Sequence, residues 1–124
     1  MPSIQSLFLA ALCAATGALA VTCGSNTYTD AQISSCVADI KRWDERQGPG
    51  AYPHKFNNYE GLAFGAYTGV LYEFPLLTSG PYRGGAPGAD RCVAAYDVNT
   101  NTATNLGAMT HTGAASRNGF VKCT

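Results

Sequence analysis

Only two histidines occur in the 124-residue chain, and both lie among residue types suited to acid–base chemistry and anion binding. His54 stands in a Tyr-Pro-His-Lys stretch, and His111 stands in Thr-His-Thr-Gly. Between them come Glu73 and Arg91. A carboxylate and an imidazole can take and give protons, and a guanidinium offers a planar donor fork for phosphate oxygens. These four side chains are together suited to moving a proton while an anion is held.

Strand periodicity predicts that these groups share one face of a sheet. Runs rich in aromatic and β-branched residues, separated by Gly, Pro and Asn, predict strands at 52–57, 69–76, 90–96, 106–112 and 119–123. Because side chains alternate across a strand, Glu73, Arg91 and His111 each point away from the apolar residues beside them. His54 shares a face with Tyr52 and Phe56. Neighbouring strands lie ~4.8 Å apart, so the groups could converge on one phosphate.

One amphipathic helix is expected on the opposite face of this sheet. Thr29 with Gln32 fits a capping box, and Gly48-Pro49-Gly50 ends the pattern, so the helix is predicted over about 30–46. Its apolar positions recur at helical spacing: Ile33, Cys36, Val37, Ile40 and Trp43. The predicted fold class is therefore α+β, with one amphipathic helix packed on a small antiparallel β-sheet and two disulfides.

The first twenty residues carry no Asp, Glu, Lys or Arg and end in Ala18-Leu19-Ala20. This small-x-small ending predicts a secretory signal peptide over 1–20, followed by a single domain over 21–124. The alternative is a buried N-terminal helix. The stretch is too short and too rich in alanine for a good membrane anchor, so we expect a secreted, extracellular protein without a membrane partner.

The cysteines agree with an oxidising compartment. Cys13 lies in the predicted signal, and four remain: Cys23, Cys36, Cys92 and Cys123. An even number in a small secreted chain predicts two disulfides, for which three pairings are possible. Cys36 on the apolar side of the helix and Cys92 on the helix-facing side of its strand favour one pair. Cys23 and Cys123 would then join the chain ends.

Charge and motif content limit the classes of function. Eight basic and eight acidic residues give a formal net charge of zero, which argues against a broad cationic surface for nucleic acid. Recognition of one nucleotide through close contacts is still compatible with that balance. The glycine-rich loop 78–89 lacks the Gly-Lys-Ser/Thr ending of a nucleotide cradle, and no metal-ligand spacing occurs. We therefore expect no cofactor and no metal. We also expect a monomer.

Several motifs spread along the chain carry a resemblance to one family. They are Cys23-Gly24-Ser25-Asn26, Tyr52-Pro53-His54-Lys55-Phe56-Asn57-Asn58-Tyr59-Glu60-Gly61, Tyr72-Glu73-Phe74-Pro75-Leu76, Pro87-Gly88-Ala89-Asp90-Arg91, His111-Thr112-Gly113-Ala114 and Asn118-Gly119-Phe120-Val121-Lys122-Cys123-Thr124. In this order the chain resembles the fungal guanyl-specific ribonucleases over nearly all of 21–124.

The resemblance implies six catalytic residues: Tyr52, His54, Glu73, Arg91, His111 and Phe120. Glu73 would be the general base and His111 the general acid, with His54 assisting the base. Tyr52 and Arg91 would bind the phosphate, and Phe120 would form an apolar wall beside it.

The resemblance also implies a guanine site made of Phe56, Asn57, Asn58, Tyr59, Glu60 and Asn118. Tyr59 would cover one face of the base, and the Glu60 carboxylate would accept from its N1 and N2 groups. The Asn57-Asn58 pair is also what a simple turn needs, because asparagine tolerates left-handed backbone geometry. The chain departs from the family pattern at Phe56, where Tyr is common, and at Thr27, where some members carry Cys. The stretch between His111 and Phe120 is one residue longer than usual.

The implied activity is guanyl-specific endonuclease cleavage of single-stranded RNA. Transesterification would give a 2′,3′-cyclic phosphate and hydrolysis a 3′-phosphate, without metal. DNA, which lacks the attacking 2′-hydroxyl, should not be cleaved. The alternative is a secreted RNA-binding or host-interacting protein that has kept the fold and lost turnover. The presence of Glu73, Arg91 and His111 favours the enzyme.

Overall fold

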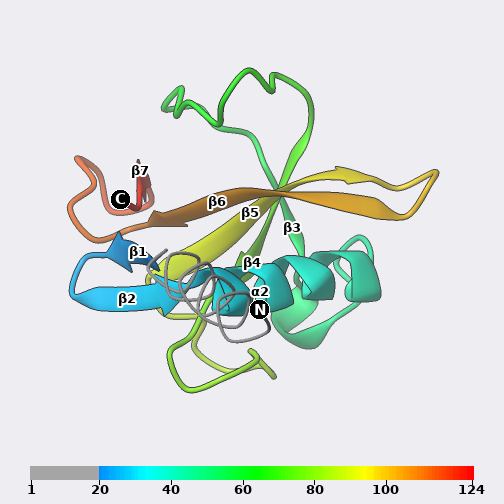
Figure 1. The fold of residues 1–124 in the computed structure, drawn as a ribbon, viewed down its shortest axis with the longest axis horizontal. Helices are drawn as coiled ribbons and strands as arrows, with labels where there is room; N and C mark the ends of the chain where they lie inside the picture. Colours follow the sequence, from blue (N-terminus) through cyan, green and yellow to red (C-terminus); the bar gives the residue numbers. More distant parts are fainter. Residues whose placement is uncertain (1–19) are drawn as a thin grey trace, which may run out of the picture.

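The computed structural model describes residues 20–124. The predicted signal peptide, with Cys13, lies outside the described residues except for Ala20. The elements in chain order are β1 (Ala20–Cys23), β2 (Asn26–Thr29), α2 (Asp30–Trp43), the 3₁₀ turn η1 (Pro49–Ala51), β3 (His54–Phe56), β4 (Leu71–Pro75), β5 (Asp90–Asp97), β6 (Thr102–Thr110) and β7 (Val121–Lys122). Figure 1 shows their arrangement.

The architecture is one helix packed on antiparallel sheets, as the sequence predicted. The main sheet has five strands in the order β3-β4-β5-β6-β7, and every neighbouring pair is antiparallel. Helix α2 contacts β4, β5 and β6 and covers one face of this sheet (Figure 1). A second sheet, the hairpin β1–β2, leads directly into the helix.

The helix begins where the capping box predicted and ends earlier than expected. The Thr29 hydroxyl accepts from the Gln32 amide at 3.2 Å, and the Gln32 side chain accepts from the Thr29 amide at 2.8 Å. The predicted end at 46 is wrong, because Asp44 adopts φ +53° and terminates the helix after Trp43. The Tyr96 hydroxyl donates to the Asp44 carboxylate at 2.8 Å, which is a tertiary contact that local periodicity does not encode.

The sheet separates two apolar clusters, one on each face. The helix side holds the larger cluster: Ile33, Val37, Ile40, Phe74, Ala94 and Ala108 are among its members. The opposite face holds a smaller cluster of Phe56, Phe64, Leu71, Val93, Met109 and Phe120. Because strand residues alternate between these faces, the residues flanking Phe74 and Cys92 point to the smaller cluster. Glu73 and Arg91 therefore lie on the face away from the helix.

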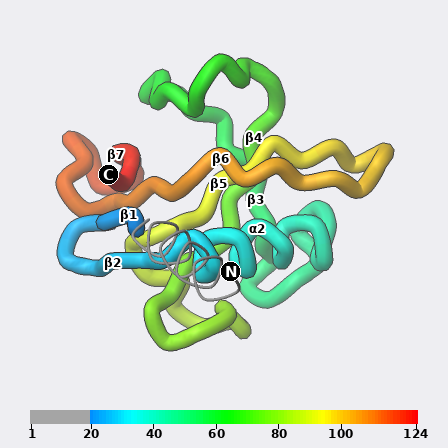
Figure 2. Tube along the Cα trace, in the orientation of Figure 1, coloured from blue at the N-terminus to red at the C-terminus, as the bar shows by residue number. Residues whose placement is uncertain are grey.

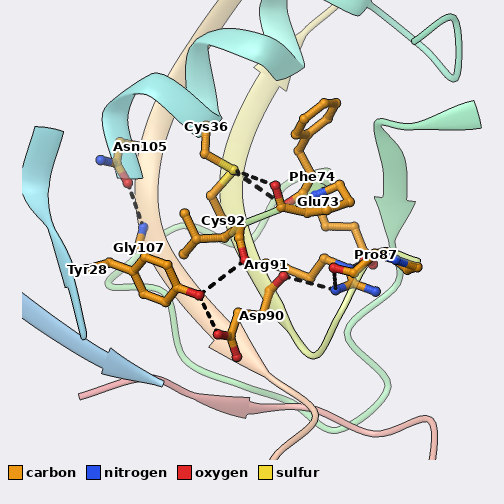
Figure 3. The surroundings of a disulfide bond; sticks show 12 residues. Tyr28, Cys36, Glu73, Phe74, Pro87, Asp90, Arg91, Cys92, Asn105 and Gly107 are labelled. Carbon is orange, nitrogen blue, oxygen red and sulfur yellow. Dashed lines mark hydrogen bonds and ion pairs between the residues drawn. A yellow bond between two sulfur atoms is a disulfide. The ribbon is translucent and has the colours of Figure 1, made fainter. Parts of the chain in front are cut away.

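Both predicted disulfides are confirmed. Cys23–Cys123 ties the chain ends across a sequence separation of 100 residues, and Cys36–Cys92 joins α2 to β5. Figure 3 shows the second bridge beside the strand positions that carry Glu73 and Arg91. The helix is thus covalently attached to the strand that carries the guanidinium.

The sequence predicted where the five strands of the main sheet lie better than where each strand begins and ends. The runs 52–57, 69–76 and 119–123 were too long, since the strands cover only His54–Phe56, Leu71–Pro75 and Val121–Lys122. The strand predicted at 106–112 corresponds to β6, which covers Thr102–Thr110, so His111 lies just beyond the end of β6. The hairpin β1–β2 was not predicted. Figure 2 traces the two long loops, between β3 and β4 and between β4 and β5, which leave the sheet on opposite sides.

Candidate active site

A buried ion pair forms the centre of the candidate site. Arg91 Nε donates to Glu73 Oε1 at 3.1 Å, and the two residues are only 4% and 7% exposed. Glu73 and Arg91 come from the adjacent antiparallel strands β4 and β5. Strand pairing therefore positions a carboxylate beside a guanidinium in a largely dehydrated place, where electrostatic interactions are strong.

The remaining nitrogens of Arg91 are held by the loop before β5 and by Tyr52. Nη1 donates to the carbonyls of Gly88 at 2.8 Å and Asp90 at 2.9 Å, and more distantly to that of Pro87 at 3.4 Å. Nη2 donates to the Tyr52 hydroxyl at 3.2 Å. Gly88 has φ +70°, a conformation that glycine adopts without strain, and its carbonyl is thereby turned to the guanidinium. The fork is fixed before any ligand arrives.

His54 lies on the same side of the sheet as Glu73. The two residues are paired across β3 and β4, and the imidazole stacks on the Tyr52 ring with centroids 3.8 Å apart. Burial lowers the pKa of His54, and the positive charges of Arg46 and Arg91 lower it further. A neutral imidazole beside Glu73 is able to accept a proton.

His111 enters the site from the segment after β6. Its Nδ1 is 2.7 Å from the carbonyl oxygen of Gly119. A carbonyl oxygen only accepts, so Nδ1 carries a proton and donates it to this carbonyl, which leaves Nε2 as the ring nitrogen that can exchange a proton with a substrate. The ring stacks on Phe120 with centroids 3.9 Å apart.

Phe120 connects the two halves of the site. Its ring centroid lies 5.9 Å from Arg91 Cζ, and the ring also stacks on His111. The structure therefore brings the six predicted catalytic residues into one continuous set of contacts: Tyr52, His54, Glu73, Arg91, His111 and Phe120.

The environment shifts the pKa of Glu73 in the direction a base requires. Burial raises the pKa of Glu73 to about 7, which outweighs the opposing effect of Arg91. The negative charge of Glu60 also raises it. A general base is most effective when its pKa is near the working pH, so this carboxylate is suited to proton transfer near neutrality.

The segment after β3 forms a compact loop whose geometry depends on Asn58. This residue has φ +54°, its side-chain amide donates to the Leu62 carbonyl at 2.9 Å, and its side-chain oxygen accepts from the Leu62 amide at 2.8 Å. These bonds close the loop and hold Tyr59 and Glu60 at its tip. Tyr59 is 90% exposed, so its ring is available to a planar ligand.

Glu60 reaches back from this loop to the segment after His111. Its Oε2 accepts from the Phe120 amide at 2.5 Å. A hydrogen bond from a backbone amide to a side chain thus joins the predicted base-binding carboxylate of Glu60 to Phe120, the aromatic residue beside Arg91. Gly119 lies beneath this contact, buried against Ser116.

The other predicted guanine-site residues have differing surroundings. Phe56 is buried, with its ring 5.5 Å from that of Phe120 and 6.5 Å from that of Phe64. Asn57 and Asn118 are exposed, one on each of the two segments that Glu60 joins.

Sequence reasoning did not single out Asp90, which organises the strand ends below the site. This carboxylate is 3% exposed and accepts from Tyr28 at 2.5 Å, Thr110 at 2.7 Å and Asn26 at 3.0 Å (Figure 3 shows the first). Asp90 and Thr110 directly precede Arg91 and His111. The sequence signal was an acidic residue at the start of a strand, directly before Arg91, and this does not reveal its partners.

Within residues 20–124, no group of three or more His, Cys, Asp or Glu side chains is placed to hold a metal ion. No helix in the same part of the chain is long and apolar enough to cross a membrane.

Comparison with known proteins places this arrangement in a family. A profile described as ribonuclease matches residues 16–124. The chain is 46% identical over 107 residues to guanyl-specific ribonuclease T1 of Aspergillus oryzae, covering 83% of this chain and 77% of that protein. It is 44% identical over 107 residues to the extracellular guanyl-specific ribonuclease Fl1 of Gibberella baccata, covering 84% and 95% of the two chains.

A solved structure agrees with these sequence matches. The ribonuclease from Hericium erinaceus superimposes with a TM-score of 0.56 at 32% identity, covering 86% of this chain and 99% of that one. Together with the profile match and the identities, this similarity shows that the chain belongs to the ribonuclease family that includes guanyl-specific ribonuclease T1.

Proposed function

We propose that the protein is a secreted endoribonuclease that cleaves single-stranded RNA on the 3′ side of guanosine. The observation that carries this proposal is the buried Glu73–Arg91 pair, flanked by His54 and facing the His111–Phe120 stack. It supplies a base, an anion fork and an acid in one place. The names of the relatives, guanyl-specific ribonucleases, support the choice of substrate.

In the first step Glu73, assisted by His54, removes the proton of the 2′-hydroxyl. The freed oxygen attacks the phosphorus, and the bond from phosphorus to the 5′-oxygen breaks. His111 Nε2 donates a proton to that leaving oxygen. Arg91 and Tyr52 bind the phosphate oxygens as negative charge grows on them, and this preorganised stabilisation needs no rearrangement because the fork is already fixed.

In the second step, hydrolysis of the cyclic phosphate, Glu73 and His111 exchange their acid and base roles. A water molecule gives a proton to His111 and attacks the cyclic phosphate, while Glu73 returns its proton to the 2′-oxygen. The product is a 3′-phosphate, and both residues regain their starting states.

Guanine recognition is assigned to the loop that ends at Glu60. Guanine presents two donors, N1–H and the N2 amino group, on one edge, and a carboxylate accepts both. Tyr59 stacks on the face of the base, and this contact does not discriminate because every base can stack. Selectivity for guanine therefore rests on the Glu60 carboxylate and on the backbone of Asn57, Asn58 and Asn118.

The setting of the enzyme is part of the same proposal. We expect removal of residues 1–20, secretion of a monomeric domain over 21–124 and no membrane partner. The two disulfides and a relative named as extracellular support this setting.

The test uses four matched dinucleoside phosphates: guanylyl and adenylyl ribonucleotides and their 2′-deoxy forms, each with and without EDTA. We expect cleavage of the guanylyl ribonucleotide alone, unaffected by EDTA. His111→Ala should lower its turnover by ~10²–10⁴-fold. Binding of the guanylyl compound without any cleavage would instead indicate an RNA-binding protein that has lost turnover. Cleavage of the deoxy form would exclude the 2′-hydroxyl as nucleophile.

A further inference from the structure

We propose that the Gly119–Phe120 peptide group couples recognition of the base to the general acid, because it is hydrogen-bonded to Glu60 on one side and to His111 on the other. Glu60 is then a positioning residue for proton transfer as well as a ligand of the base. The inference rests on the proposed ribonuclease activity and adds that the base bound at Glu60 affects how well His111 protonates the leaving oxygen.

Two hydrogen bonds meet at this one peptide group. The N–H of Phe120 donates to Glu60 Oε2 at 2.5 Å, and the carbonyl oxygen of Gly119 accepts from His111 Nδ1 at 2.7 Å. These two backbone atoms belong to the same planar unit, in which the N–H and the C=O point in opposite directions. The carboxylate and the imidazole therefore lie on opposite sides of the peptide group and are connected through it.

A chain of hydrogen bonds of this kind polarises along its length. A negative carboxylate at the N–H shifts electron density towards the carbonyl oxygen, which then accepts more strongly from the imidazole. Hydrogen bonds in such a chain strengthen one another by roughly 10–30% each. The bond at Nδ1 sets the orientation of the His111 ring and directs Nε2 to the proton that it exchanges. Glu60 thus helps to hold the acid in its working orientation.

The fold holds this peptide group in place. Gly119 is buried, its amide donates to the Ser116 carbonyl at 3.1 Å, and Val121 pairs with Thr110 of β6. A Cβ atom on Gly119 would lie 2.8 Å from Ser116 Oγ and 3.5 Å from Glu60 Oε2. A glycine at this position therefore lets both the turn and the Glu60 carboxylate close on the peptide group.

Glu60 can bind guanine without giving up its hydrogen bond to the peptide group. The residue is exposed, and an ionised carboxylate has about four lone-pair sites on its two oxygens. The Phe120 amide occupies one of them on Oε2, which leaves the others for the N1–H and N2 amino groups of guanine. Adenine presents a lone pair at N1, which repels the carboxylate. Its bond to the peptide group, and with it the orientation of His111, should then be weakened.

The consequence is that the preference for guanine depends on the leaving group. A departing 5′-oxygen of a nucleoside must be protonated, so its departure needs His111. The 4-nitrophenolate group leaves as a stable anion and needs an acid far less. Coupling through the peptide group acts on the acid alone, so it should be detected with the nucleoside leaving group and not with nitrophenolate.

The experiment compares GpU with guanosine 3′-(4-nitrophenyl phosphate), which share the guanosine 3′-phosphate and differ in the leaving group. Glu60→Ala should lower kcat on both, and on GpU by a further factor on the order of tenfold, within the ~10²-fold that a misplaced catalytic group can cost. Weaker binding of the base affects both substrates alike. The influence of the Glu60 charge on Glu73 is also shared, because both substrates need the base, so both effects cancel in the comparison.

Two further variants calibrate this comparison. His111→Ala removes the acid itself, so it should lower kcat on GpU far more than on the nitrophenyl ester. Tyr59→Ala is the matched control, because Tyr59 belongs to the same loop and stacks on the same base, while the peptide group is bonded to Glu60. It should lower the activity on both substrates by the same factor.

A second measurement uses the unaltered protein and the two adenosine compounds that correspond to these substrates. The ratio of kcat for guanosine to kcat for adenosine should be on the order of tenfold greater with uridine as the leaving group than with nitrophenolate, for the same reason. This readout does not depend on any substitution.

Two results would overturn the coupling while leaving the proposed function intact. One is an equal loss of kcat on the two guanosine substrates in Glu60→Ala. The other is a ratio of guanosine to adenosine kcat that does not change with the leaving group. A wild-type protein that cleaves neither guanosine substrate, or a His111→Ala variant without a selective loss on GpU, would instead overturn the proposed mechanism, and the coupling with it.

Discussion

Glu73 shows how one residue can combine a high pKa with a nearby positive charge. Burial makes the charged carboxylate unfavourable, and Arg91 at 3.1 Å offsets only part of that cost. The resulting group holds its proton more tightly than an exposed glutamate, so it is a stronger base once ionised. Arg91 also donates to Tyr52, and therefore contacts both the proposed base and the proposed second phosphate ligand.

A pH profile should report this shift directly. Below about pH 7, where Glu73 is protonated, kcat/KM for a guanylyl dinucleotide should fall about tenfold per pH unit. Glu73→Gln should lower activity by ~10²–10⁴-fold at pH 8 and remove this dependence, because its amide does not titrate. A wild-type profile that is flat between pH 5 and 7, or a Gln variant that keeps the same slope, would assign the base to another residue.

Glu60 should determine selectivity between guanine and adenine. Glu60→Ala should cut guanylyl turnover on the order of 10²-fold, since hydrogen bonds to a charged group are worth ~1.5–3 kcal/mol each. Glu60→Ala should also reduce the ratio of kcat/KM for the guanylyl substrate to that for the adenylyl substrate. Adenine has an acceptor at N1, so the Glu60 carboxylate of the wild-type protein disfavours it, and the variant lacks that carboxylate. Tyr59→Ala is the control, since loss of stacking should weaken both substrates and keep their ratio. The measurement is kcat/KM on the matched pair; an unchanged guanine preference in Glu60→Ala would assign base recognition to the backbone alone.

At the scale of elements, the site depends on how the ends of β5 and β6 are held together. Asp90 of β5 accepts from Thr110 of β6 and from Tyr28 of β2, so one buried carboxylate joins both sheets. Arg91 and His111 are the next residues along β5 and after β6. Arg91 and His111 therefore take their positions from a polar network on the opposite side of the strands.

Removing this charge should destabilise the fold. Asp90→Asn replaces one accepting oxygen with a donor that faces other donors, and should lower the free energy of unfolding by roughly 3 kcal/mol. Asp97→Asn is the matched control, since Asp97 is exposed and surface substitutions usually change stability by less than about 0.5 kcal/mol. Urea denaturation of the three proteins measures the difference. Equal midpoints would show that the network contributes nothing to stability.

For the whole molecule, the carboxylate that we propose as the catalytic base reduces stability at neutral pH. The pKa of Glu73 is about 7 in the folded protein and 4.5 as its ordinary value, so the folded state binds more protons between these values. The contribution of Glu73 to the free energy of unfolding therefore falls as pH rises through this window, by up to about 3 kcal/mol at ~1.36 kcal/mol per pKa unit.

The comparison with Glu73→Gln isolates this effect, because all other titrating groups are shared. The free energy of unfolding of the wild-type protein, minus that of the variant, should decrease between pH 4 and pH 8. An increase over the same range would mean that the ion pair with Arg91 dominates and that the pKa of Glu73 is lowered on folding.

The sequence was sufficient for features that depend on neighbouring residues. The capping box at Thr29, the apolar spacing of α2 and the alternation along β4 and β5 are local, so they predicted the helix start, the strands and the face shared by Glu73 and Arg91. Helical spacing placed Cys36 on the apolar side of α2, and strand alternation placed Cys92 on the side of β5 that faces the helix, so together they predicted the disulfide. The motifs that resemble the ribonucleases identified the family for the same reason, because residue type and order are written in the chain.

Only the tertiary structure decided properties that depend on residues distant in sequence. Asp44, at the end of α2, accepts a hydrogen bond from the distant Tyr96, and the buried Asp90 accepts hydrogen bonds from residues of β2 and β6. The pKa of Glu73 depends on how completely the folded chain removes water from it, and the Gly119–Phe120 peptide group lies between Glu60 and His111 only because the loop carrying Glu60 packs near the segment after β6. Burial and long-range contacts are set by packing of the whole chain, which no local pattern of residues records.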